Sequence, residues 1–153
     1  MTSSPPALDR FLLAQSEDYA TALAELRRGR KEGHWVWYVL PQLRGLGLSA
    51  MSVEYGIADL AEARAFLAHP VLGPRLRECV SALCAHTDVS AAEILGGVDA
   101  MKFRSCLTLF AAAATEPELF QRALRVFFEG QADPKTIERL AAPGGAEEPL
   151  IQR

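Results

Sequence analysis

Residues 70–84 have the sequence Pro-Val-Leu-Gly-Pro-Arg-Leu-Arg-Glu-Cys-Val-Ser-Ala-Leu-Cys, and this stretch indicates the fold class. Its apolar side chains recur at helical spacing and form one stripe, which consists of Leu72, Leu76, Cys79, Val80 and Leu83. Proline is well tolerated where a helix begins, so Pro70 fits the start. A helix with one apolar face buries that face against other elements. The stretch therefore predicts a core packed from helices.

Helix starts are marked at several other places in the chain. Asp59 and Ser90 are each followed three residues later by Glu, which is the capping-box pattern. Asp133 precedes a proline, and such a pair typically begins a helix. Asp99 is a further candidate N-cap, for an apolar helix over residues 100–114. These patterns predict helices along most of the chain.

The N-terminal part predicts two helices and a less regular connection. A short helix is expected near residues 8–12, and a second one is capped by Asp18 and ended by Gly29. Residues 34–40 are apolar and aromatic, a run too short to distinguish a buried strand from a buried helical turn. Residues 44–49 contain two glycines and predict a loop.

Together these patterns predict a mainly α, single compact multi-helix domain of about seven or eight helices with little or no β structure. The chain has 153 residues, which is typical of one domain, and we expect residues 1–142 to form it. Residues 143–153 contain two Gly, two Glu and two Pro and predict a flexible C-terminal tail.

The composition is that of a folded domain, with 50% apolar and 23% charged residues. A net charge of -3 argues against a general nucleic-acid coat, although a local basic pocket is compatible with it. Residues 1–7 are polar and proline-rich, unlike a signal peptide, and no apolar run reaches the length of a membrane span. We therefore expect a cytoplasmic protein with no membrane partner.

The three cysteines, Cys79, Cys84 and Cys106, are an odd and sparse set that does not indicate a disulfide framework. Cys79 and Cys84 fall in the apolar stretch over residues 70–84. Buried free thiols fit a reducing compartment. A zinc site at Cys84 and His86 with a distant histidine lacks the paired ligand spacing of such sites. We expect neither a metal site nor a cofactor.

Residues 27–49 combine cations, aromatic rings, an amide and glycines. Cations bind phosphate oxygens, aromatic faces stack on bases, and an amide offers a donor and an acceptor to a base edge. The candidate ligand-binding residues of this segment are Lys31, His34, Trp35, Trp37, Gln42 and Ser49. In the alternative interpretation the cations form a solvated face after a helix and both tryptophans belong to the core.

A second candidate set lies on the apolar helix expected over residues 100–114. Asp99, Lys102, Ser105 and Thr108 follow one another at intervals of three, so each neighbours the next along one helix face. Polar groups on such a helix are exposed, paired or functional. The alternative is structural: Asp99 caps the helix, Lys102 extends to solvent and both hydroxyls bond to the preceding turn.

Acid–base chemistry beside such a pocket needs a carboxylate. Asp59 and Glu62 already have a role in capping. Glu54, in the segment Ser52-Val53-Glu54-Tyr55, has none and follows the glycine loop, so it is the candidate acid or base.

Four segments resemble one widespread bacterial family. They are residues 29–38 (Gly-Arg-Lys-Glu-Gly-His-Trp-Val-Trp-Tyr), Leu40-Pro-Gln with Gly45-Leu-Gly-Leu-Ser, residues 62–76, and residues 102–110 (Lys-Phe-Arg-Ser-Cys-Leu-Thr-Leu-Phe). Over residues 8–140 the chain resembles the domain-of-unknown-function family numbered 1810, sometimes misnamed calpastatin. That family usually has two serines where this chain has Ser105-Cys106, which leaves Ser105 as the candidate. The family's name implies no activity.

More remotely, the chain resembles the NADAR (YbiA-like) superfamily of small helical proteins, whose members act on N-glycosidic bonds in ADP-ribose-linked or riboside-phosphate substrates. That superfamily tends to have an early Ser/Thr-Val-Glu-His segment. Ser52-Val53-Glu54-Tyr55 matches it in part, with Tyr55 in place of the histidine and no tryptophan just before it. The resemblance implies a YbiA-like fold, Glu54 as acid or base, and Lys102 as a contact to ligand phosphate or carbohydrate.

The sequence thus predicts a hydrolase of an N-glycosidic bond in an ADP-ribose-linked or nucleotide-sugar substrate, with Glu54 and Lys102 as catalytic residues and Tyr55 and Ser105 as ligand contacts. A carboxylate would stabilise the oxocarbenium-like transition state of such a reaction or activate water. The expected partner is a small nucleotide or ADP-ribosylated molecule, with nucleic acid only as a modified substrate. The alternatives are a non-catalytic nucleotide- or phosphate-binding module, and a protein-interaction domain with an apolar patch at Phe127 and Phe128. The sequence predicts no oligomeric state.

Overall fold

The computed structural model describes residues 6–142. This part of the chain contains a 3₁₀ helix, η1, and nine α-helices, so the mainly α fold is confirmed. In chain order the elements are η1 (Pro6–Leu8), α1 (Asp9–Arg28), α2 (Val36–Val39), α3 (Ala50–Tyr55), α4 (Leu60–Ala68), α5 (Leu72–Cys84), α6 (Ala91–Leu95), α7 (Gly97–Ala113), α8 (Glu118–Phe128) and α9 (Pro134–Ala141). The tail predicted for residues 143–153 lies outside the described residues.

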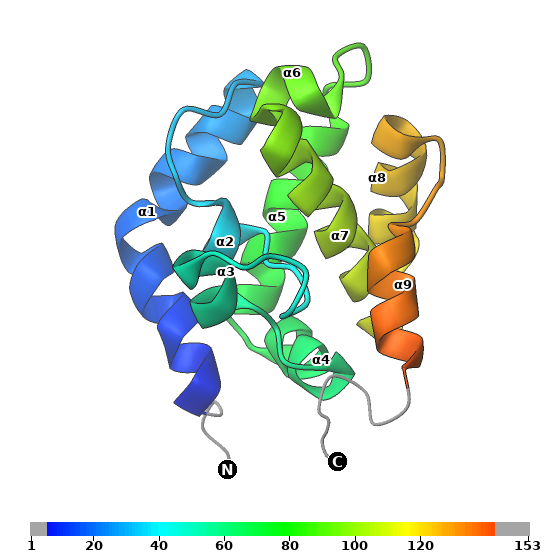
Figure 1. Cartoon of the computed structure of the whole chain (residues 1–153). Coiled ribbons are helices and arrows are strands. Elements are labelled where there is room, and N and C mark those ends of the chain that lie inside the picture. The colour runs from blue at the N-terminus through cyan, green and yellow to red at the C-terminus, as the bar shows by residue number, and fades with distance from the viewer. Residues whose placement is uncertain (1–5, 143–153) are drawn as a thin grey trace.

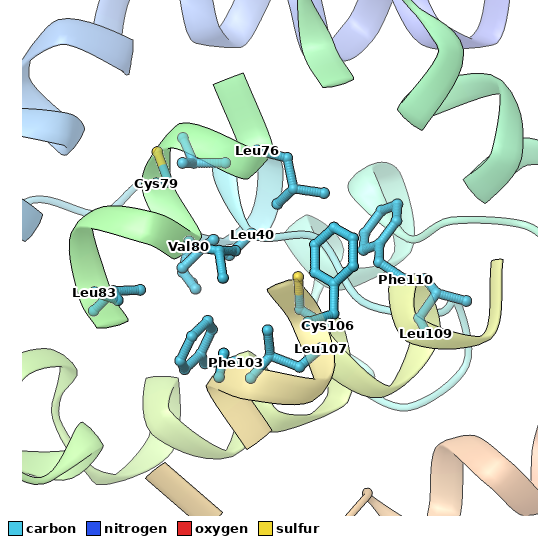
Figure 2. Close-up of a cluster of buried hydrophobic side chains, with 14 of the residues drawn as sticks. Leu40, Leu76, Cys79, Val80, Leu83, Phe103, Cys106, Leu107, Leu109 and Phe110 are labelled. Carbon is cyan, nitrogen blue, oxygen red and sulfur yellow. The ribbon is translucent and has the colours of Figure 1, made fainter. Parts of the chain in front are cut away.

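Helix α7 lies at the centre of the packing and contacts α4, α6, α8 and α9 (Figure 1). It takes this place because apolar side chains occupy most of its circumference, and a helix of that kind is buried on several sides. Figure 2 shows Phe103, Cys106 and Phe110 of α7 near Leu76 and Val80 of α5. The stripe that the sequence predicted on α5 is buried, and α5 packs on α1 and α8 as well.

Several predicted helix ends are confirmed. Ser90 and Glu93 form both bonds of a capping box, at 3.0 and 2.8 Å. Asp133 caps α9, and Gly29 ends α1 with a φ of +80°, a conformation that glycine adopts without strain. Asp59 caps α4 by accepting the Glu62 N–H at 2.9 Å.

Two predictions about helix boundaries are wrong. The N-terminal part forms one continuous helix, α1, because no glycine or proline interrupts residues 9–28. Asp18 therefore caps nothing, and its carboxylate instead accepts the Tyr38 hydroxyl. Asp99 is no N-cap either, since α7 already begins at Gly97 and Asp99 lies in its first turn.

The ambiguous run over residues 34–40 forms the short helix α2. Helix α3 was not predicted. It begins where Ser49 Oγ accepts the Ser52 N–H at 3.1 Å, and it contacts α2. An isolated parallel bridge pairs Leu43, before α3, with Ile57, after it, and it is the β pairing found in residues 6–142. The bridge fixes the loop over residues 44–49 beside α7 and α9. Among the described helices, none is both long and apolar enough to cross a membrane.

Candidate functional site

A groove of about 470 Å³ lies between the first turns of α7, the start of α9 and the loop before α3. We name it the Lys102 groove, and it is lined by Gln42, Leu46, Gly47, Val98, Met101, Lys102, Arg104, Ser105, Asp133, Pro134 and Lys135. A hollow of this volume falls within the range of small-molecule sites. Val98 and Met101 are exposed at 72% and 52%, so the groove also offers apolar surface.

The lining carries more positive than negative charge, with Lys102, Arg104 and Lys135 against the single carboxylate of Asp133. Arg104 has a structural task as well, because its Nε and Nη2 donate to the carbonyl oxygens of Gln131 and Ala132 at 2.9 and 2.8 Å. These bonds hold the turn that leads from α8 to α9. The groove thus presents cations to an anionic ligand.

Asp133 is buried, and one of its oxygens is occupied by the fold. Its Oδ2 accepts the Thr136 N–H at 3.0 Å, the Thr136 hydroxyl at 2.6 Å and the Ser105 hydroxyl at 3.2 Å. Thr108 Oγ1 accepts the Asp133 N–H at 2.8 Å and donates to the Arg104 carbonyl at 2.8 Å. Ser105 Oγ also lies 3.2 Å from the Met101 carbonyl oxygen, so both hydroxyls make the bonds to the preceding turn that the structural alternative expects, and their contacts with Asp133 in addition fasten α7 to the start of α9.

A second, smaller hollow adjoins the groove, and Gln42 and Lys102 line both. We name it the Trp37 cavity, and its lining is Val36, Trp37, Leu40, Gln42, Met51, Ser52, Tyr55, Gly56 and Lys102. Its volume of about 10 Å³ suits one water-sized group. Lys102 Nζ lies 4.9 Å from the centre of the Trp37 ring, which is within the range of a cation–π contact.

Two polar groups of the Trp37 cavity, the Trp37 indole and the Lys102 ammonium, can only donate hydrogen bonds, while Gln42, Ser52 and Tyr55 can donate and accept. Trp37 Nε1 is buried and has no hydrogen-bond partner among the described residues. Burial, with the nearby Glu54 carboxylate as a second cause, raises the pKa of Tyr55, so its phenol stays protonated. Ser52 accepts the Ser49 hydroxyl at 3.0 Å. The cavity therefore suits an acceptor rather than a second donor.

Lys31 lies behind Lys102 and not in the groove lining. Its Nζ is 2.8 Å from Asp99 Oδ2, and its side chain is only 8% exposed. Lys102 Nζ is 3.8 Å from the other oxygen of Asp99. Because two ammonium groups share one carboxylate, and the closer one is Lys31, a net positive charge remains at Lys102.

Trp35 belongs to the core, at 2% exposure. Its Nε1 donates to Glu25 Oε1 at 2.8 Å, and the same oxygen accepts the N–H groups of Glu32 and Gly33 at 2.8 and 3.0 Å. Burial alone would raise the pKa of Glu25, but these three hydrogen bonds together with Arg28 lower it below its usual value. This cluster ties the end of α1 to the start of α2.

Three further predicted residues lie outside both hollows. His34 is exposed, Ser49 caps α3, and Glu54 is exposed on α3. The backbone carbonyl of Glu54 accepts Arg10 Nε at 2.8 Å, and its side chain is not among the groove or cavity lining. The structure thus brings together Trp37, Gln42, Tyr55, Lys102 and Ser105 from the predicted set, while Lys31 supports them from behind.

The glycines of the loop over residues 44–49 are explained by close packing. Gly45 has a φ of +100°, and the Arg139 guanidinium lies against it while its Nε donates to the Arg44 carbonyl at 2.7 Å. A side chain at Gly47 would collide with the Ser52 hydroxyl. These contacts allow α9 and α3 to approach the loop from two sides and so close the groove.

Other candidate features of the sequence are packed into the fold. Phe127 and Phe128 are partly buried with ring centres 5.8 and 6.1 Å from that of Phe103, so they form no open patch. The three cysteines are free and buried. Within residues 6–142 no group of three His, Cys, Asp or Glu side chains gathers as a metal site would require.

Arg104 and Lys135 are groove residues that the sequence analysis missed. Each is a single cation on a helix, a pattern typical of solvated surfaces. Arg104 lies on α7 with Lys102, whereas only the contact between α7 and α9, which are separated by the whole of α8, brings Lys135 into the same groove.

Comparison with known proteins identifies the family. The family described as "Protein of unknown function (DUF1810)" matches residues 5–140, and the chain belongs to it. A solved structure, that of the conserved hypothetical protein Rv1873 from Mycobacterium tuberculosis, is similar over 89% of this chain and 97% of its own, with 45% identity and a TM-score of 0.87. No curated protein matches the chain.

Proposed function

We propose that this member of the DUF1810 family binds a small phosphate-bearing ligand of the nucleotide class in the Lys102 groove. The observation that carries the proposal is the position of Lys102, which lines both hollows and shares its only ion-pair partner among the described residues, Asp99, with the closer Lys31. An ammonium that is incompletely neutralised at the junction of two hollows favours an anion there.

The remaining lining supports a ligand with both a charged and an apolar part. Arg104 and Lys135 add positive charge along the groove, where phosphate oxygens would lie. Exposed Val98 and Met101 offer apolar surface on which a base or sugar would pack. Gln42 offers an amide donor and acceptor at the inner end. Small anions with no organic part would use only some of these groups.

The test is calorimetric titration of ADP-ribose, ADP and pyrophosphate into the wild-type protein, the Lys102→Gln variant and the Arg64→Gln variant. Arg64 is exposed on α4 and lines neither hollow, so it controls for a general loss of positive charge. We expect Lys102→Gln to weaken binding about tenfold or more, because hydrogen bonds to charged groups contribute about 1.5–3 kcal/mol. The proposal would be refuted if none of the three anions bound, or if the wild type and Lys102→Gln bound them with equal affinity.

The second candidate function is hydrolysis of an N-glycosidic bond in an ADP-ribose-linked substrate. In this proposal the protein is a distant relative of the NADAR superfamily and acts in the cytoplasm. It is supported by Glu54 lying on the same short helix as Met51, Ser52 and Tyr55 of the Trp37 cavity. The experiment is incubation with ADP-ribosylated guanosine or DNA and measurement of released ADP-ribose. Release that is lost in Glu54→Gln supports hydrolysis. If ADP-ribose binds to Glu54→Gln as to the wild type and no product is released, hydrolysis is ruled out and only the binding function is supported.

A further inference from the structure

The two tryptophans stand two residues apart but have different hydrogen-bond partners. The indole N–H of Trp35 is satisfied by Glu25 at 2.8 Å. The indole N–H of Trp37 is buried and has no partner among the described residues. A buried donor without a partner is destabilising, so such a group persists where something else accepts its hydrogen.

The surroundings of Trp37 indicate what that acceptor is. The Trp37 cavity holds about one water-sized group and is lined by Lys102, Gln42 and the protonated Tyr55 hydroxyl. The Lys102 ammonium can only donate, whereas Gln42, Tyr55 and Ser52, which also lines the cavity, can each donate as well as accept. Trp37 and Lys102 both line the cavity, and the Lys102 ammonium lies 4.9 Å from the centre of the Trp37 ring.

Charge decides between a neutral and an anionic acceptor. Around the cavity mouth Lys31 and Lys102 share the carboxylate of Asp99, at 2.8 and 3.8 Å, which leaves an excess of one positive charge. No carboxylate lines the cavity itself. An oxygen that carries negative charge is therefore favoured over a carbonyl or hydroxyl oxygen.

We propose that the Trp37 cavity is the subsite for one phosphoryl oxygen of the ligand held in the Lys102 groove, with the Trp37 indole N–H and the Lys102 ammonium as its donors. The inference rests on the proposed function, and it specifies which atom of the ligand lies at the inner end of the Lys102 groove. The cavity admits one oxygen atom, while the rest of the phosphate and the organic part of the ligand remain in the groove.

The test uses the indole N–H signals in a ¹H–¹⁵N spectrum of the full chain, which has two tryptophans and hence two such signals. The Trp35→Phe variant assigns them by elimination. ADP-ribose and inorganic phosphate are titrated as probes, and adenosine serves as the probe without phosphate. We expect the Trp37 indole proton to move downfield with both phosphate-bearing probes and to remain in place with adenosine, while the Trp35 signal stays unchanged throughout.

A pair of matched variants supplies a second measurement. Trp37→Phe keeps an aromatic ring under Lys102 and removes the unpartnered N–H together with part of the indole ring, so we expect folding to be retained and ADP-ribose affinity to fall about 10- to 100-fold. Trp35→Phe removes an N–H that is already bonded to Glu25, so it should lower thermal stability and leave the affinity within about twofold.

The outcomes separate this inference from the function on which it rests. If ADP-ribose binding depends on Lys102 while the Trp37 indole signal does not move, the proposed subsite is refuted and the proposed binding in the Lys102 groove is retained. If the indole moves equally with adenosine, the acceptor is not a phosphoryl oxygen. If neither probe binds at all, both proposals are wrong. The indole measurement is made on the wild-type chain, so it decides the matter even if Trp37→Phe does not fold.

Discussion

Trp35 and Glu25 are joined by a buried hydrogen bond of 2.8 Å between the indole nitrogen and a carboxylate oxygen. That oxygen also receives the backbone N–H groups of Glu32 and Gly33, so one carboxylate organises the whole turn between α1 and α2. Trp37 then enters the cavity lining from α2. Glu25 thus organises the turn before α2 and lines neither hollow of the candidate site.

We predict that Glu25→Gln destabilises the protein in a pH-dependent manner. The pKa of Glu25 is lower in the folded than in the unfolded chain, so its stabilisation is fully present above the unfolded pKa and is lost as pH falls through the folded value. At pH 7 the free energy of unfolding should fall by about 2 kcal/mol, the size of hydrogen bonds to a charged group. Urea unfolding measures this difference.

The same comparison below the folded pKa of Glu25 provides the control. There the wild-type carboxyl is itself neutral, so the two proteins should converge in stability. A gap that stays constant across the acid range would show that the charge of Glu25 contributes nothing.

We predict that Lys31→Met changes both stability and ligand binding. Removing one partner of a largely buried ion pair leaves Asp99 with the more distant Lys102, and the expected loss is about 3 kcal/mol. Asp99 then neutralises Lys102, so ADP-ribose should bind several-fold more weakly. Lys31→Met combined with Asp99→Asn should recover part of the affinity. Unchanged affinity in the single variant would contradict the charge argument.

We predict opposite effects for two glycine-to-alanine substitutions. A Cβ at Gly73 would lie far inside the contact distance of the Leu67 carbonyl oxygen, where backbone cannot yield easily. Gly73→Ala should therefore destabilise by about 3 kcal/mol as α5 is pushed from α4. Gly97→Ala meets nothing within 4 Å in the first turn of α7 and should be neutral or slightly stabilising. Thermal unfolding of both variants provides the comparison.

The sequence predicted those parts of the fold that depend on local patterns. The α5 stripe, the capping box at Ser90 and the start of α9 at Asp133 each follow from residues a few positions apart. Asp18 and Asp99 were wrongly predicted to be N-caps because aspartate also binds partners that are distant in sequence. Asp18 accepts a hydrogen bond from the Tyr38 hydroxyl, and Asp99 forms an ion pair with Lys31. Local sequence does not distinguish these uses.

The site was predictable only in part for a related reason. Gln42 was singled out as the amide of the segment over residues 27–49 and Lys102 as a polar group on an apolar helix, and both line the groove. Trp35 and Trp37 look equivalent in sequence, yet tertiary packing buries Trp35 in the core with Glu25 as its hydrogen-bond partner and leaves the Trp37 N–H without one among the described residues. Arg104 and Lys135 become neighbours through tertiary packing alone.

We predict that the three cysteines of the folded protein resist alkylation at pH 8. Burial is the main cause that raises the pKa of each thiol, to about 12 for Cys79, so almost no thiolate is present. Iodoacetamide followed by mass measurement should give unmodified protein in buffer and triply modified protein in urea. Rapid labelling of Cys106 without denaturant would mean that α7 opens readily.

The most direct test of the account is to map ADP-ribose binding on the backbone amide signals of the ¹⁵N-labelled chain. We predict chemical-shift changes concentrated at Gly47, Lys102, Ser105 and Lys135, which come from three separate segments and meet only in the Lys102 groove. Changes clustered elsewhere, for example along the exposed face of α1, or no changes at ligand concentrations in the millimolar range, would contradict it.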